Sequence, residues 1–148
     1  MKSRKSIILM SILIVLTVIF AFWHLSTREE IPENALSISY KEETYLVDID
    51  KLELKQVTGT RVNGKGEEKT VDALGIALKD ILMAENIIDY SSVKVVAEDS
   101  YTAQLTADEV KELNKVYMIS EDNELRLIVF GDTNSKRSVS DIAQVIVE

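Results

Sequence analysis

The residues whose types and spacing most suggest a binding or catalytic site lie in the stretch 54–66, LKQVTGTRVNGKG. Gly59, Gly64 and Lys65 have most of the spacing of a phosphate-binding loop, in which backbone amides and a lysine hold the phosphates of a nucleotide. Gly66 then stands where that motif needs a serine or threonine for Mg²⁺, and the acidic EEKTV follows instead of a helix that could receive phosphate. The stretch is therefore predicted to be a strand ending in a hairpin turn, because glycine adopts positive φ at little cost.

Two side chains that dominate enzyme active sites are almost missing from the chain. The sequence has no cysteine, and its single histidine, His24, lies in the apolar N-terminal stretch. Ser–His–Asp, Cys–His and zinc-hydrolase mechanisms therefore cannot be built from residues 28–148 of this chain. Only carboxylate, lysine, tyrosine, serine or threonine chemistry is left.

Acidic residues offer two weak candidates for cation binding. Asp48 and Asp50 would point to the same face of a strand, but exposed, solvated carboxylates explain this spacing better. The segment 120–124, SEDNE, is acidic but lacks the spacing of an EF-hand loop, and a polar hairpin turn accounts for it. No metal site is predicted from either group.

Acidic residues outnumber basic ones outside the N-terminal stretch. The chain has 17 basic and 25 acidic residues, and three of the basic ones, Lys2, Arg4 and Lys5, precede residue 28. Residues 28–148 therefore carry 14 basic and 25 acidic groups, a net charge of −11. Such a surface repels phosphate backbones, so nucleic acid is excluded as a partner.

The N-terminal residues predict a membrane anchor. Residues 6–27, SIILMSILIVLTVIFAFWHLST, contain no charged side chain and are long enough to cross a bilayer as a helix. The basic tail 1–5 precedes them, so the positive-inside rule places this tail in the cytoplasm and residues 28–148 outside. A cleaved signal peptide is the alternative, but the apolar run does not end in a small-x-small cleavage site. The prediction is a single-pass cell-membrane protein with a transmembrane signal anchor at 6–27.

A short polar linker at 28–35 is followed by a predicted extracytoplasmic α+β domain at 36–148. Alternation of apolar and polar residues at period two indicates most of its elements. Strands are predicted on this basis at 36–40, 44–49, 52–62, 93–98, 116–120, 125–131 and 138–148, and residues 67–74 resume an extended pattern after the turn.

One main helix and one short helix complete the predicted domain. The main helix is expected within 75–87, where Leu78, Ile81 and Leu82 fall on one face. Thr106 and Glu109 have the spacing of a capping box, which predicts that a short helix begins there. The fold class is therefore a mixed-strand α+β domain with one main helix, preceded by one transmembrane helix.

Four stretches occur in an order and at a spacing that resemble a known family. They are LKQVTGTR, ALGIALKDIL, VKVVAEDSYTAQL and LRLIVFGDTNSKRSVSDIAQV. Together they resemble the molybdopterin-binding domain of the sulfite oxidase family over roughly residues 45–148. The chain is similar to the short, single-domain forms, so the resemblance implies a reduced version of the sulfite-oxidase-like molybdopterin-binding fold.

The resemblance also implies that the metal ligand is lost. In catalytic relatives the counterpart of QVTGTR carries a cysteine that binds molybdenum, followed by a glycine and an arginine. Gly59 and Arg61 correspond to the glycine and the arginine, whereas the cysteine position falls on Val57. Valine has no lone pair to donate to a metal.

Two further landmarks of the family are altered. The basic motif that grips the pterin and its phosphate usually reads arginine, small residue, valine, lysine, tryptophan. Here Arg137 is kept, but Ser140 replaces the lysine and Asp141 the tryptophan, and both changes weaken the binding of a phosphate. The Asp-Gly-Tyr turn appears as DSY, with Ser100 in place of a glycine that adopts positive φ freely.

The predicted function is that of a membrane-anchored binding or interaction module, not an enzyme, and no cofactor is expected. Arg61, Lys136 and Arg137, together with Lys65, are predicted to form a basic spot for a small anion or an acidic protein segment. Two alternatives stay open at this point. One is a molybdopterin-dependent oxidoreductase or accessory redox subunit, and the other is a structural subunit of a membrane complex.

Overall fold

The computed structural model describes residues 10, 12–21, 35–121 and 124–148. The chain divides into two compact units, Met1–Ile31 and Pro32–Glu148. The predicted boundary between the linker and the domain lies close to the start of the second unit.

In the N-terminal unit, residues 10 and 12–21 are helical. None of the helices in the described part of the chain combines the length and the apolar character that crossing a bilayer requires. This finding contradicts the predicted transmembrane signal anchor at 6–27 and the single-pass cell-membrane localisation inferred from it. That prediction rested on the length of an apolar run and on its flanking charges in the sequence, whereas a span needs a continuous apolar helix of about 20 residues. The tail 1–5, both ends of the predicted anchor and most of the linker lie outside the described residues.

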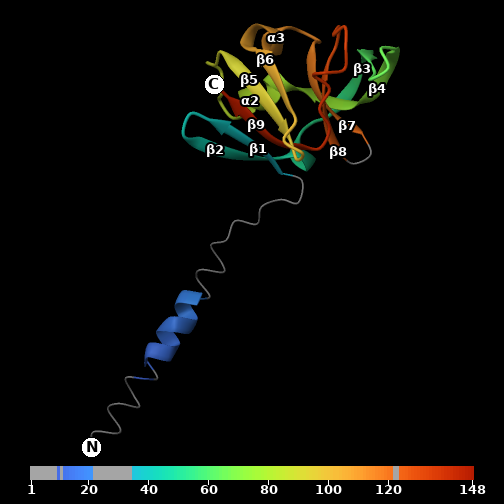
Figure 1. Ribbon diagram of the computed structural model, residues 1–148. Helices are drawn as coiled ribbons and strands as arrows, with labels where there is room; N and C mark the ends of the chain where they lie inside the picture. The colour runs from blue at the N-terminus through green and yellow to red at the C-terminus, as the bar shows by residue number, and fades with distance from the viewer. Residues whose placement is uncertain (1–9, 11, 22–34, 122–123) are drawn as a thin grey trace, which may run out of the picture. The chain divides into compact units, whose positions relative to one another are not determined.

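The larger of the two sheets has five strands, and the C-terminal strand is at its centre. Its order is β2 (Glu43–Asp48), β1 (Ala35–Tyr40), β9 (Ile142–Val147), β5 (Ser92–Ala97) and β6 (Thr102–Thr106). β9 runs parallel to β1, and the other neighbouring strands are antiparallel. The sheet thus brings the first and last described strands of the domain side by side (Figure 1).

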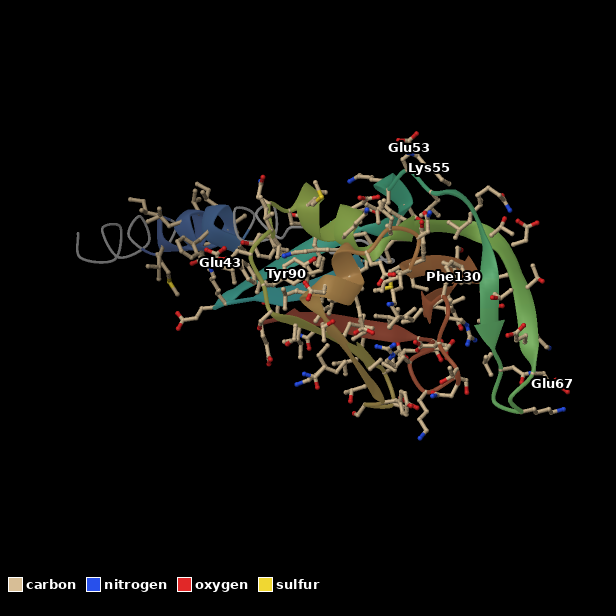
Figure 2. All side chains as sticks on the ribbon, turned by 90° about the horizontal axis from the view of Figure 1, so that it is seen from above. Glu43, Glu53, Lys55, Glu67, Tyr90 and Phe130 are labelled. Carbon is tan, nitrogen blue, oxygen red and sulfur yellow. The ribbon has the colours of Figure 1, made fainter. Side chains whose placement is uncertain are left out.

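The smaller sheet has four antiparallel strands. Its order is β3 (Lys55–Val62), β4 (Glu68–Ala77), β7 (Val116–Glu121) and β8 (Glu124–Val129). Only the last three residues of β4, at 75–77, pair with β7. The hairpin of β3 and β4 therefore extends beyond the rest of the sheet, with Glu67 at its far end (Figure 2).

The turn of this hairpin is where the sequence predicted it. The backbone N–H of Gly66 donates to the carbonyl of Asn63 over 3.0 Å, and Gly66 has φ of +82°. The side chain of Asn63 accepts further hydrogen bonds from the backbone N–H groups of Lys65 and Glu67. These contacts hold Lys65 in a turn of the chain, and no helix N-terminus follows that could receive a phosphate.

Three short helical segments connect the strands: η1 (Ile49–Lys51), α2 (Leu78–Ala84) and α3 (Ala107–Lys111). The predicted capping box is confirmed, because the Thr106 hydroxyl accepts from the N–H of Glu109 and the Glu109 carboxylate accepts from the N–H of Thr106. The main helix is shorter than expected, since residues 75–77 finish β4 by pairing with β7.

The main apolar core is built by strands of both sheets together with α2. Leu78, Ile81 and Leu82 of α2 are fully buried in it, as their spacing predicted. Its other contributors include Ile38 from β1 and Leu127 from β8. Burial of this apolar surface is the main force that holds the two sheets together.

The secondary structure differs from the predicted α+β fold mainly in its proportion of strand to helix. Nine strands and only two α-helices make up the described part of the domain, so the fold is mostly β. The predicted strand at 52–62 begins at Lys55, because η1 and the residues after it interrupt the extended chain. β6 was not predicted, although Ala103 and Leu105 alternate with exposed residues along it.

Candidate functional site

The residues that the resemblance matched to a metal-binding loop lie on β3 and pack against other parts of the domain. Val57, at the cysteine position, is only 8% exposed and pairs with Ala73 of β4. A Cβ added to Gly59 would lie 2.6 Å from ring carbons of Phe130. The ring of Phe130 thus covers this glycine, so packing alone accounts for a residue without a side chain.

Phe130 belongs to a second apolar cluster, separate from the main core. Val71, Ile119 and Ile128 form the centre of this cluster, and Phe130 and Tyr117 pack against it with their ring centroids 5.6 Å apart. In the alternating pattern of a strand, Ile128 points away from the face that carries the main core. The β3–β4 hairpin is anchored through this cluster on the other face of the smaller sheet.

Arg61 is engaged by an acidic residue of the same sheet. Its Nη2 lies 3.3 Å from Oε1 of Glu121, at the end of β7. The other carboxylate oxygen of Glu121 lies 2.6 Å from Nε of Arg126. Two guanidinium groups therefore share one carboxylate, which ties β3 to β7 and β8.

Arg137 is engaged by two carboxylates. Its Nε donates to Oδ2 of Asp132 over 2.8 Å, its Nη2 contacts the other oxygen of Asp132, and its Nη1 donates to Oε1 of Glu109 over 2.7 Å. The hydrogen bonds from Arg137 to Asp132 raise the pKa of the guanidinium further above its ordinary value. Arg137 therefore fastens the loop that follows β8 to α3.

Glu109 has a lowered pKa in this arrangement. Partial burial by itself raises the pKa of the Glu109 carboxyl, but the hydrogen bond from the backbone of Thr106 and the contacts with Arg137 outweigh it. The ionised carboxylate is thus the form that the fold stabilises.

The predicted basic spot is not open to an anion at its two arginines. Arg61 and Arg137 are each held by carboxylates on different elements, and they share none of these partners. Lys136 is exposed, and its backbone carbonyl accepts a hydrogen bond of 2.6 Å from the hydroxyl of Tyr101. Lys65 is also exposed, in the turn of the β3–β4 hairpin.

The residues present do not fit a molybdopterin cofactor. Val57 offers no ligand to a metal, and the guanidinium of Arg137 already binds two carboxylates that a phosphate would have to displace. Ser140 and Asp141 add no positive charge beside it. Ser100 adopts a left-handed backbone, with φ of 71°, as the resemblance predicts for a position where the family has glycine.

A different feature of the domain has the dimensions of a ligand site. A hollow of about 760 Å³ opens where the ends of the two sheets meet. Four carboxylic acids line it, from four separate parts of the chain: Asp50 of η1, Glu98 after β5, Glu124 at the start of β8 and Asp141 before β9. We call this feature the acidic hollow.

Apolar side chains and backbone complete the acidic hollow. Ile49, Leu54, Leu125 and Ile142 line it together with Ala35, Ser120 and Ala143, and no lysine or arginine belongs to its described lining. The backbone N–H of Glu98 donates to the carbonyl of Asp141 over 2.9 Å, so two of the acidic residues are fixed next to each other. Asp141 has φ of 50°, which turns the chain into β9.

Sequence reasoning named three of these acids, Asp50, Glu124 and Asp141, but it did not find the site. Asp50 was paired with Asp48, yet Asp48 caps η1 and forms an ion pair of 3.0 Å with Lys51. Glu124 was treated as part of a turn. Within the described residues, no group of three acidic or histidine side chains is placed to hold a metal ion. The four acids come together only through the fold, and no local pattern marks them.

Comparison with known proteins gives no family for the chain. No protein-family model matches it, and neither does any curated protein. The resemblance to the sulfite oxidase family therefore stays a hypothesis.

The contact between Gly59 and Phe130 predicts a specific pattern of stabilities. Gly59→Ala should lower the free energy of unfolding by about 1–3 kcal/mol, because the added methyl group overlaps the ring. Combining it with Phe130→Leu should cost less than the sum of the two single changes. Gly64→Ala is the matched control and should be nearly neutral, since no atom lies within 4 Å of its added Cβ. Urea unfolding measures all four variants, and additive costs would contradict the proposed contact.

The ion pair of Glu109 predicts a pH-dependent contribution to stability. Because the folded-state pKa of Glu109 is below its ordinary value of 4.5, its contribution is present above pH 4.5 and is lost as the pH falls through the folded pKa. Glu109→Gln should therefore destabilise the protein most at pH 7 and progressively less below pH 4.5. In an Arg137→Ala background the same change should have a smaller effect. Unfolding curves at several pH values test this, and a difference independent of pH would refute it.

Proposed function

We propose that this protein is a non-catalytic binding module that captures an organic cation in the acidic hollow. The observation that carries the proposal is the lining itself, which brings four carboxylic acids into one hollow and no basic side chain among the described residues. Hollows lined by charge of one sign concentrate the field and attract ligands of the opposite sign. The excess of acidic residues in 28–148 adds to this field.

The lining favours an ammonium or guanidinium group on an aliphatic stem. Ile49, Leu54 and Leu125 supply apolar contacts beside the carboxylates, as the methylene groups of a lysine, an arginine or a polyamine require. The hollow fits a metal ion less well, because the described residues provide no group of three side chains that could bind one. Lysine-rich protein segments and free polyamines share the recognised chemistry, and experiment separates these two sources.

From the resemblance to the sulfite oxidase family, this proposal takes the fold and not the activity. We infer that the chain is a short, degenerate member whose function moved away from the old cofactor loop. Support comes from Val57 at the cysteine position and from the carboxylates that hold Arg61 and Arg137. The same contacts favour a binding module over a molybdopterin-dependent oxidoreductase, and they favour a cation over the anion expected from the sequence.

The test is calorimetric titration of the full chain with spermidine and, separately, with a lysine-rich peptide. Glu98→Gln and Asp141→Asn should each weaken binding by about three- to tenfold, which corresponds to about 0.7–1.4 kcal/mol. Asparagine keeps the positive φ of residue 141 accessible. Binding should also weaken as salt rises.

Glu53→Gln is the matched control for this titration. Glu53 is exposed, lies outside the lining of the acidic hollow and carries the same charge (Figure 2). Its loss should leave the affinity nearly unchanged if the hollow is the site. Equal weakening by all three variants would show that only the net charge attracts cations, and absence of binding to either probe would remove the proposal.

A further inference from the structure

A second hollow lies on another part of the domain and has a different character. Its volume is about 290 Å³, and its lining is mainly apolar, from Met83, Ile87, Ile88 and Tyr90. It shares no lining residue with the acidic hollow. We call it the apolar groove.

The backbone at the end of α2 shapes this groove. The N–H of Ile87 donates to the carbonyl of Leu82 over 2.9 Å, and the N–H of Asn86 donates to the carbonyl of Met83 over 3.0 Å. Asn86 has φ of 58°, so the helix ends in a Schellman motif with asparagine at the left-handed position. This turn directs Ile87 into the core and leaves Ile88 at the surface.

Large apolar side chains stand exposed at the rim. Ile88 is 65% exposed and Met83 is 60% exposed, although α2 already buries a different set of residues in the core. Exposed apolar side chains that meet around a concave surface are typical of sites that bind a partner. Ile87, which is almost fully buried, provides the floor.

The two charged residues in the lining are both lysines. Nζ of Lys111 lies 4.8 Å from the centroid of the Tyr90 ring, which holds this ammonium group over the groove. Lys79 contributes the second ammonium group from the first turn of α2. Neither lysine forms an ion pair with any residue that the structure describes. On a domain rich in acids, this groove has a basic rim, and none of the described residues that line it is acidic.

We propose that the apolar groove docks a segment of another protein that carries a large apolar side chain flanked by carboxylates. The apolar side chain fills the groove between Met83 and Ile88, and the carboxylates lie against Lys79 and Lys111. The charges of the lining determine this choice of occupant. A small amphiphile would leave the two exposed rim residues in water, whereas a protein segment covers them. A second copy of this acidic chain brings unfavourable net charge.

The probe is a fluorescein-labelled synthetic peptide with a Phe-Leu pair between two pairs of glutamates, titrated with the full chain and followed by fluorescence anisotropy. Ile88→Ser should weaken binding by about tenfold and Lys111→Gln by about three- to tenfold. A peptide with glutamines in place of the glutamates should bind more weakly to the wild type. Because Ile88 and Lys111 lie at the surface, melting temperatures should stay near that of the wild type.

Leu113→Ser provides the matched control. Leu113 is 75% exposed, two residues beyond Lys111, and does not line the groove, so its replacement should leave the affinity unchanged. Three outcomes would overturn the proposal. They are equal affinity of all variants for the peptide, saturable binding of dodecanoate without binding of the peptide, and a dimer in sedimentation that dissociates on Ile88→Ser.

Discussion

The position of the last strand in the larger sheet is the constraint on which the rest of the domain depends. β9 lies between β1 and β5, so the hairpin of β1 and β2 joins the hairpin of β5 and β6 only through this strand. Val145 and Val147 of β9 are buried in the main core, which the smaller sheet covers from its other side. Pairing of residues 37–40 with 144–147 spans most of the domain in sequence, so the larger sheet closes only after the whole chain is available.

The acidic hollow is a direct consequence of this arrangement. Asp141 and Ile142 enter it because they lead into β9, and Ala35 enters it because β1 starts beside them. Glu98 is fixed next to Asp141 by a backbone hydrogen bond across the register shift between β5 and β9. Glu98 and Asp141 are therefore attached to the central strands of the larger sheet, which favours preorganisation of these two carboxylates.

Local sequence patterns predict part of this structure, whereas the rest depends on contacts between residues far apart in the sequence. Three features were predictable because each depends on residues only a few positions apart in the sequence. They are the burial of Leu78, Ile81 and Leu82, the capping box at Thr106 and the turn after Val62. The ion pair of Arg61 with Glu121 joins residues 60 positions apart, so no spacing rule reveals it. The basic spot was predicted from four charges, and the acidic partners of two of them, Arg61 and Arg137, are visible only in the fold.

The N-terminal stretch and β6 show two further limits of sequence reasoning. Apolar composition at 6–27 predicted a membrane span, but the helix that the structure describes there does not meet the requirements of one. β6 has the alternating burial of a strand, yet it is only five residues long and one of its two inward residues is the small Ala103. For β6 the alternating pattern was present, and the shortness of the strand concealed it.

The two hollows also show why net charge is a poor guide to recognition on this domain. The charge of −11 acts over about a Debye length, roughly 8–10 Å, whereas the lining of each hollow acts at contact. At the acidic hollow the net charge of the domain and the charge of the lining are both negative, and both attract a cation. Added salt screens both attractions and therefore weakens the capture of a cation. At the apolar groove the two charges have opposite effects on an acidic segment. The net negative charge of the domain repels the segment, whereas Lys79 and Lys111 attract it. Salt screens both effects there, and apolar contact with Met83 and Ile88 remains, so binding at the groove depends much less on ionic strength than binding at the acidic hollow.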